Sequence, residues 1–182
     1  MDEAQRAYER LSAPSPGRPA LGAAGHPAVG LAHYRLAELH RLRGEFATAE
    51  EHFRHASQRG LEPQPGLALL RLAQGHIAPA VAAIRRVLDE AHDPVTRWKV
   101  LPAAVEIMLA SGDVGSARTY ADELAHVTAG RDAPLLSALS AYAIGSVLLA
   151  EGDGRAALSS LRQAWTAWQV MDRPTKRPVP GR

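Results

Sequence analysis

The 182-residue chain has no cysteine, which excludes disulfide bonds and thiolate metal sites and fits a reducing compartment. Aromatic residues are also scarce, at 5% of the sequence, whereas apolar residues reach 46%. Alanine and leucine dominate the apolar residues, which favours closely packed helices over a β-sandwich. No apolar run approaches the roughly 20 residues of a membrane helix, and the N-terminal MDEAQRAYERL lacks the apolar region of a signal peptide. We therefore expect a helical, cytoplasmic protein with no membrane partner.

A concentration of positive charge is absent from most of the chain. The net charge is +2, but the last twelve residues, MDRPTKRPVPGR, hold four basic residues and one acid and so carry +3. Residues 1–170 therefore sum to −1, which is not the balance of a nucleic-acid-binding surface. The tail favours at most weak, salt-sensitive attraction to phosphates through Arg173, Lys176, Arg177 and Arg182. We expect no sequence-specific DNA binding by this chain alone.

Clusters of proline and glycine divide the sequence into segments. Residues 13–27, APSPGRPALGAAGHP, are typical of a linker, and they follow a short predicted helix over residues 1–12. Residues 28–170 are predicted to form a helical repeat array of about four hairpins. Residues 171–182 contain three prolines and no apolar period, which predicts a disordered basic tail.

The stretch LHRLRGEFATAEEHFRHA, residues 39–56, interrupts a helical pattern and then resumes it. Gly44 fits the left-handed conformation just past a helix, and Glu45 favours the positive N-terminus of the next helix. Phe46 is predicted to fill the seam between the two antiparallel helices. The helix before the turn is apolar on two flanks, which predicts packing on both sides. One of these flanks comprises Leu31, Tyr34, Leu39 and Leu42.

The same hairpin signature recurs along the chain. Further turns are predicted at Gly75, Gly112 and Gly152, so that successive turn glycines are 31, 37 and 40 residues apart. Each turn is followed by small or apolar residues at the same offsets as Phe46, Ala49, Phe53 and Ala56. Periods of this size are typical of stacked helical hairpins. The sequence therefore predicts an all-α fold of antiparallel hairpins stacked as an α-solenoid.

These motifs resemble the tetratricopeptide repeat, with its small residue in the first helix, its glycine-acid-aromatic turn and its alanine three residues beyond the aromatic. The ordered combination over about residues 27–170 is similar to the repeat region of actinobacterial LuxR-type transcriptional regulators. That resemblance implies a C-terminal helix-turn-helix domain, which this chain lacks, and a further helix after WQVMDRP, where the sequence departs from the pattern. By this resemblance the chain is a truncated or frame-shifted piece of such a regulator.

Motifs for chemistry are few. His52 and His55 are three residues apart and could share a metal ion, but no HExxH motif is present and the neighbouring residues indicate a solvated helix face. Glu50 and Glu51 are adjacent, so a helix points them about 100° apart and they cannot act as a facing pair. The glycine-rich GRPALGAAG does not follow a predicted strand and lacks the lysine of a phosphate loop. We expect no catalytic residues, no cofactor and no metal.

The sequence leaves more than one function open. The first is a protein-interaction or signal-sensing module of a transcriptional regulator, which binds a protein, a peptide or a small effector. The second is a free-standing tetratricopeptide-type adaptor unrelated to transcription, and the third is an enzyme or enzyme accessory with a site between hairpins. For the first two, the repeat register predicts a concave groove lined by the first helix of each hairpin. The predicted groove residues are Tyr34, Glu38, Arg41, Glu106, Tyr142 and Ser146.

The last predicted helix is expected to lack a polar cap. RAALSSLRQAWTAWQV places Ala157, Leu161, Ala164 and Trp168 on one face and Trp165 beside it. Because repeat arrays need a polar end for solubility, Trp165 or Trp168 should be partly exposed. Such exposure favours self-association through the C-terminal end.

Overall fold

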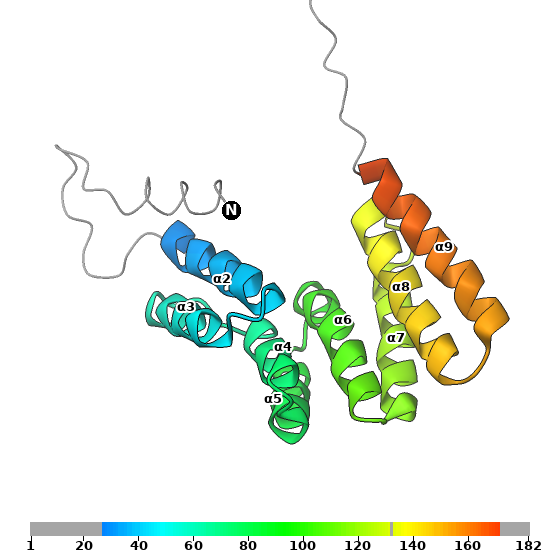
Figure 1. The fold of residues 1–182 in the computed structure, drawn as a ribbon. Coiled ribbons are helices and arrows are strands. Elements are labelled where there is room, and N and C mark those ends of the chain that lie inside the picture. Colours follow the sequence, from blue (N-terminus) through cyan, green and yellow to red (C-terminus); the bar gives the residue numbers. More distant parts are fainter. Residues whose placement is uncertain (1–26, 132, 172–182) are drawn as a thin grey trace, which may run out of the picture. The chain divides into compact units, whose positions relative to one another are not determined.

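The computed structural model describes residues 27–131 and 133–171, and within these ranges every regular element is a helix (Figure 1). The all-α fold class is therefore confirmed. The chain divides into two compact units, one up to Val87 and one from Leu88 onward. The helices are α2 (Pro27–Leu42), α3 (Phe46–Gln58), α4 (Gly66–Ala73), α5 (Ile77–Glu90), α6 (Pro94–Ala110), α7 (Val114–Thr128), α8 (Pro134–Ala150) and α9 (Gly154–Met171). The predicted N-terminal helix, most of the predicted linker and the predicted tail lie outside the described residues.

Four short turns join these helices in pairs, and all four share one backbone geometry. The predicted turn glycines all have positive φ, from 77° at Gly44 to 88° at Gly152. At the first turn the Gly44 amide donates to the Arg41 carbonyl at 3.0 Å and the Glu45 amide donates to the His40 carbonyl at 2.9 Å. This pair of bonds caps the last carbonyls of a helix and needs a left-handed residue, which glycine adopts without strain. The same two bonds recur at Gly75, Gly112 and Gly152.

A second repeated feature lies in the helix that follows each turn. Five residues after the turn glycine, every pair has an alanine that is almost completely buried: Ala49, Ala80, Ala117 and Ala157. Seven residues before the glycine, every pair has another small or β-branched buried residue: Ala37, Ala68, Val105 and Gly145. Small side chains at these two positions let the helices of a pair approach closely.

In the first unit, α4 contacts both α2 and α3. Their shared core consists of Ala37, Ala49, Phe53 and Leu70, with Tyr34, Phe46 and Leu67 packed against it. Tyr34 lies edge-on to Phe53 with ring centroids 5.4 Å apart, and its hydroxyl accepts a hydrogen bond from the Gly66 amide at 3.1 Å. This contact satisfies one of the unpaired amides at the start of α4. The predicted role of Phe46 in the seam is therefore confirmed.

The predicted packing of α2 on both flanks is wrong in part. Leu36 and Ala37 are buried, as expected, but Leu31 and Leu42 are exposed, Leu42 to 73%. Leu42 is the last residue of α2 and lies next to the turn. The buried residues of α2 are instead Val29, Gly30, His33, Leu36 and Ala37, which follow a single helical face.

In the second unit, α8 contacts α6, α7 and α9, and α6 contacts α7 (Figure 1). The seam between α8 and α9 is tight at Gly145, where an added Cβ would lie 2.8 Å from Leu161 Cγ. Ala157 and Ala164 are buried in the same helix pair, and Trp168 lies against Tyr142 with ring centroids 5.6 Å apart. This seam is therefore filled by small and apolar groups.

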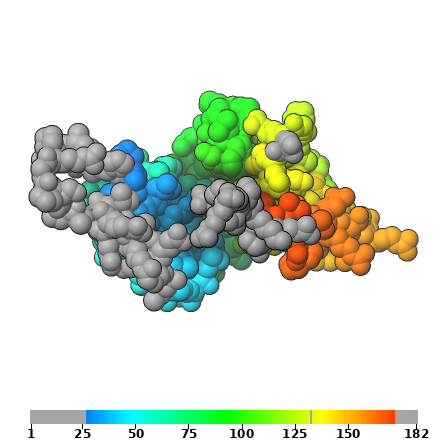
Figure 2. Space-filling view, turned by 90° about the horizontal axis from the view of Figure 1, so that it is seen from above, coloured from blue at the N-terminus to red at the C-terminus, as the bar shows by residue number. Residues whose placement is uncertain are grey.

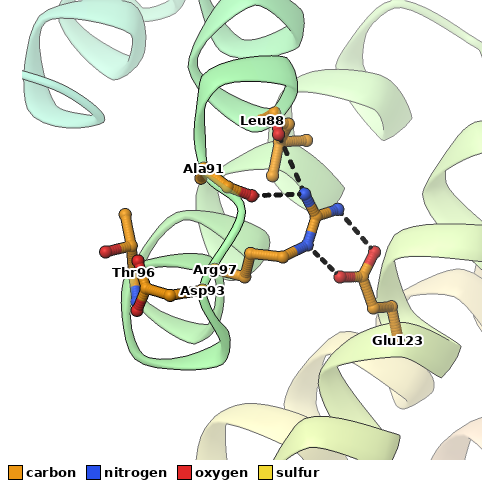
Figure 3. A network of polar contacts seen from close by, with 6 residues as sticks. All are labelled: Leu88, Ala91, Asp93, Thr96, Arg97 and Glu123. Atoms are coloured by element: carbon orange, nitrogen blue, oxygen red, sulfur yellow. Dashed lines mark hydrogen bonds and ion pairs between the residues drawn. The ribbon is translucent and has the colours of Figure 1, made fainter.

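Arg97 fastens the start of the second unit (Figure 3). Its Nη1 donates to the carbonyls of Leu88 at 2.8 Å and Ala91 at 2.9 Å, which lie at the end of α5. Its Nε and Nη2 bind both carboxylate oxygens of Glu123 on α7. Asp93 begins α6 by accepting a hydrogen bond from the Thr96 amide at 2.8 Å. One guanidinium thus satisfies helix-terminal carbonyls and joins them to a neighbouring helix.

The outer face of α9 is open. Trp165 is 62% exposed, which confirms the predicted partial exposure of a tryptophan on the last helix. Leu158, Val170 and Met171 of the same helix are exposed as well. In the space-filling view the orange part of α9 forms an uncovered surface (Figure 2). Among the described residues, no helix combines the length and apolarity that crossing a membrane would require.

Candidate functional site

Four histidines gather in the first hairpin, on helices α2 and α3. His33 and His40 lie on α2, and His52 and His55 lie on α3. His33 is 5% exposed, whereas the other three side chains are half-buried. The neighbouring Glu51 and Arg54 are exposed, as the predicted solvated face requires, whereas His52 and His55 themselves are half-buried.

Three of these rings are close enough to act together. His33, His52 and His55 each offer one ring nitrogen within 4.8 Å of the other two. His33 Nδ1 and His52 Nδ1 are 2.9 Å apart, so the N–H of one ring donates a hydrogen bond to the nitrogen of the other. The ring centroid of His33 is 4.9 Å from that of His55 and 5.2 Å from that of His52. Within the described part of the chain, every fully buried side-chain nitrogen or oxygen has a hydrogen-bond partner.

The surroundings hold His33 and His52 in their neutral form. Burial, together with the nearby charges of His52, His55 and Arg59, lowers the pKa of His33 to about 4, and burial makes the largest contribution. Burial also lowers the pKa of His52, helped by His40 and His55 and opposed by Glu51. Near neutral pH both rings are therefore neutral, and each has one nitrogen able to accept a hydrogen bond or bind a metal ion.

His40 extends the cluster toward the turn. Its ring stacks on His52 at 5.3 Å with only 5° between the ring planes. Its Nδ1 contacts the Glu45 carboxylate, so Glu45 binds a histidine and makes no side-chain cap to the first amides of α3. Glu45 thus stands at the N-terminus of α3, as expected, while its carboxylate contacts His40 across the turn.

Of the predicted groove residues, three lie in the first unit and are engaged within it. Tyr34 binds the Gly66 amide, as described above. Arg41 donates two hydrogen bonds to the Glu38 carboxylate, at 3.1 and 3.2 Å. All three side chains are half-buried. An additional ion pair, between Glu50 of α3 and Arg71 of α4 at 2.6 Å, was not predicted from the sequence.

The other three predicted groove residues lie in the second unit, on α6 and α8, which contact each other. Glu106 is exposed on α6 and Tyr142 is 50% exposed on α8. Ser146 is half-buried, and its hydroxyl donates to the Tyr142 carbonyl at 2.9 Å. Tyr142 also lies against Trp168, so this part of α8 and α9 presents two neighbouring aromatic rings.

The sequence contained a signal for the histidine cluster that spacing along one helix misses. His33 and His55 lie eleven residues on either side of Gly44. In an antiparallel hairpin centred on that glycine, residues at equal distances from the turn face each other. The spacing of three residues along α3 groups only His52 with His55. Comparing distances from the predicted turn adds His33 to that pair.

Comparison of the chain with family models, with curated proteins and with solved structures found no match in any of the three.

Proposed function

We propose that the chain is a protein-interaction module whose hairpins stack in the manner of tetratricopeptide repeats. The observation that carries this proposal is a packing pattern that occurs in both units. In the first unit α4 contacts both helices of the preceding pair, and in the second unit α8 does the same. Together with four identical glycine turns, this is the neighbour-to-neighbour packing that repeat arrays use.

The surface best suited to a partner in the second unit comprises Glu106, Tyr142 and Trp168. Tyr142 is half exposed and its ring lies against that of Trp168 at a 49° tilt, and aromatic side chains of this kind dominate binding energy at protein interfaces. Glu106 adds an exposed carboxylate on α6, the first helix of the preceding pair. A peptide with apolar residues and a basic residue matches this chemistry, and a small effector is the less favoured ligand.

A peptide selection followed by affinity measurements tests this proposal. Peptides enriched on the purified chain would be labelled, and their binding would be followed by fluorescence anisotropy. We expect Tyr142→Ala to weaken binding at least tenfold, in keeping with the loss of an aromatic anchor, and Glu106→Gln to weaken it less. Thr119→Ala, an exposed change on α7, is the matched control and should leave binding unchanged. Enriched peptides that ignore Tyr142→Ala would contradict the proposed surface.

We further propose that this module belongs to a LuxR-type transcriptional regulator, as the sequence resemblance implies, and the alternative is a free-standing adaptor. The coding sequence downstream separates the two. An in-frame or frame-shifted helix-turn-helix region supports the regulator, and its absence favours the adaptor. In either case a mobility-shift competition should find no promoter fragment that survives a large excess of unrelated DNA.

Self-association through α9 is the remaining proposed interaction. The exposed Trp165, Leu158, Val170 and Met171 place apolar area on one helix. Sedimentation velocity over a range of concentrations should show reversible association that Trp165→Ser reduces. A strict monomer at high concentration would contradict this part of the proposal.

A further inference from the structure

The three histidines His33, His52 and His55 meet the geometric requirement of a metal site. Their nearest ring nitrogens all lie within 4.8 Å of one another. A tetrahedral ion with metal–nitrogen bonds of about 2.0–2.1 Å holds its ligand nitrogens about 3.3 Å apart. His33 and His52, at 2.9 Å, must separate slightly, and the remaining nitrogens must approach by up to about 1.5 Å. Rotation of the half-buried rings of His52 and His55 supplies that movement, while buried His33 stays fixed between the helices.

The chemistry of the ligand set selects the class of ion. Three neutral imidazoles without a thiolate suit zinc, nickel and copper, whereas magnesium and calcium prefer oxygen ligands. Because His52 and His55 are only half-buried, solvent reaches these two rings, and a water molecule would complete a tetrahedral ligand set. The nearby Arg59 guanidinium opposes a cation, and the carboxylate of Glu51 near His52 favours one.

We propose that His33, His52 and His55 bind one late first-row divalent metal ion, with Zn²⁺ as its representative, and thereby fasten α2 to α3. This inference is independent of the proposed interaction function. A simple hydrogen bond between neutral rings would need only His33 and His52, whereas the cluster brings a third ring within 4.9 Å of His33. Bound metal would clamp the first hairpin alone, since all three ligands lie on α2 and α3.

The test uses the full 182-residue chain without a polyhistidine tag, titrated with ZnCl₂ in competition with a chromophoric chelator at neutral pH. We expect one tight equivalent of Zn²⁺ in the wild type. His52→Gln and His55→Gln should each weaken that equivalent about 100-fold or more, since even the loss of groups that only orient a ligand costs 10–100-fold. Helicity measured by circular dichroism confirms that each variant folds. Both residues are half-buried, so these variants avoid the larger disturbance expected at His33.

His76→Gln is the matched control, because His76 is an exposed histidine of the same unit in the turn before α5. Its Zn²⁺ affinity should equal that of the wild type. Long-range proton–nitrogen NMR of the imidazole rings should show one ring nitrogen of each of His33, His52 and His55 shifting on saturation. The proposal is overturned by a chain that binds no Zn²⁺, by a tight equivalent that survives His52→Gln or His55→Gln, by one that His76→Gln removes equally, or by shifts confined to other rings.

Discussion

The first hairpin (α2 and α3) and the last hairpin (α8 and α9) have the same turn geometry but differ in the side chains that pack between their helices. Between α2 and α3 the seam holds aromatic and titratable side chains, among them Phe53, Tyr34 and the buried His33. Between α8 and α9 it holds Gly145, alanines, Leu161 and the Tyr142–Trp168 contact, and neither helix contains a histidine. An added Cβ at Gly145 would lie 2.8 Å from Leu161 Cγ. The turn therefore sets the backbone geometry of a hairpin, whereas the side chains between its helices determine whether its stability depends on pH or on metal ions.

The largest expected difference concerns the apolar residue nine positions after the turn glycine. It is Phe53 in the first hairpin, fully buried, and Leu161 in the last, half-buried. Phe53→Ala should lower the free energy of unfolding of the first unit by about 3–5 kcal/mol. Leu161→Ala should cost the second unit about 2 kcal/mol, because a half-buried side chain loses less contact.

Tryptophan fluorescence assigns each loss to a unit, because Trp98, Trp165 and Trp168 all lie in the second unit. In urea unfolding, Leu161→Ala should shift the fluorescence transition. Phe53→Ala should shift the protection of α2 and α3 in hydrogen exchange. Equal losses of unfolding free energy from Phe53→Ala and Leu161→Ala would contradict the expected difference between the two seams.

The next prediction concerns the close approach at Gly145. In Gly145→Ala the new Cβ would lie 2.8 Å from Leu161 Cγ and 3.2 Å from the Leu161 backbone nitrogen, so α8 and α9 must separate. We expect a loss of about 1–3 kcal/mol, the usual cost of overpacking, reduced by the roughly 1 kcal/mol that alanine gains over glycine in a helix. Adding Leu161→Ala removes the clashing side chain, so thermal melts of the double variant should show a smaller loss than the two single losses added together. A stabilised Gly145→Ala protein would contradict the tight seam.

An equal effect is expected at the two turns, similar in size to the net loss at Gly145. Gly44→Val and Gly152→Val place a β-branched residue at φ of 77° and 88°, while no atom lies within 4 Å of either added Cβ. The cost is therefore one of backbone conformation, on the order of 1–2 kcal/mol at each site. Gly154→Ala, without positive φ and also in open space, is the control and should be neutral or stabilising. Unequal costs at Gly44 and Gly152, measured by thermal unfolding, would mean that the two turns are not equivalent.

Much of this fold follows from local sequence, because the controlling interactions lie within one turn of helix. The left-handed glycines and the alanine five residues later could be predicted because both act on neighbours close in the chain. The all-helical fold followed from the same spacing. Leu42 fits the apolar period of α2 and was therefore expected to be packed, but it is exposed. The period does not show how far along α2 the neighbouring helix reaches.

The candidate site could be predicted only in part, because it depends on the register of one helix against another. His52 and His55 were recognisable as a pair, whereas His33 joins them across the hairpin. The Arg97–Glu123 pair joins residues 26 positions apart, and the Glu50–Arg71 pair joins residues 21 apart. The apolar periodicity of the sequence does not predict these two ion pairs, because their charged residues look like ordinary surface residues.

The response to acid follows from the sign of the histidine pKa shifts. An unfolded histidine binds a proton near pH 6.5, whereas folded His33 binds one only near pH 4, and the pKa of His52 is lowered as well. Between these values the unfolded chain binds more protons, so the stability of the first hairpin falls as the pH falls below about 6.5, and the His33 contribution to this loss is complete below about pH 4. The groups that face His33 and contribute to this response are His52, His55 and Arg59.

Carboxylates respond in a lower pH range. The pKa values of Glu50 in the first unit and Glu151 in the second are lowered from an ordinary 4.5, each by hydrogen bonds from an arginine. Their contribution is present above pH 4.5 and lost as the pH falls through the folded value. The interval from about pH 6.5 to pH 5 therefore isolates the histidines.

Hydrogen exchange of the metal-free chain across that interval, corrected for intrinsic exchange rates, tests the difference between the two seams most directly. We expect amide protection in α2 and α3 to decrease between pH 6.5 and pH 5, by the equivalent of about 1 kcal/mol or more. Protection in α8 and α9 should stay constant, and His33→Gln should abolish most of the change in the first hairpin. A uniform loss of protection in both hairpins, or a loss confined to α8 and α9, would contradict the account.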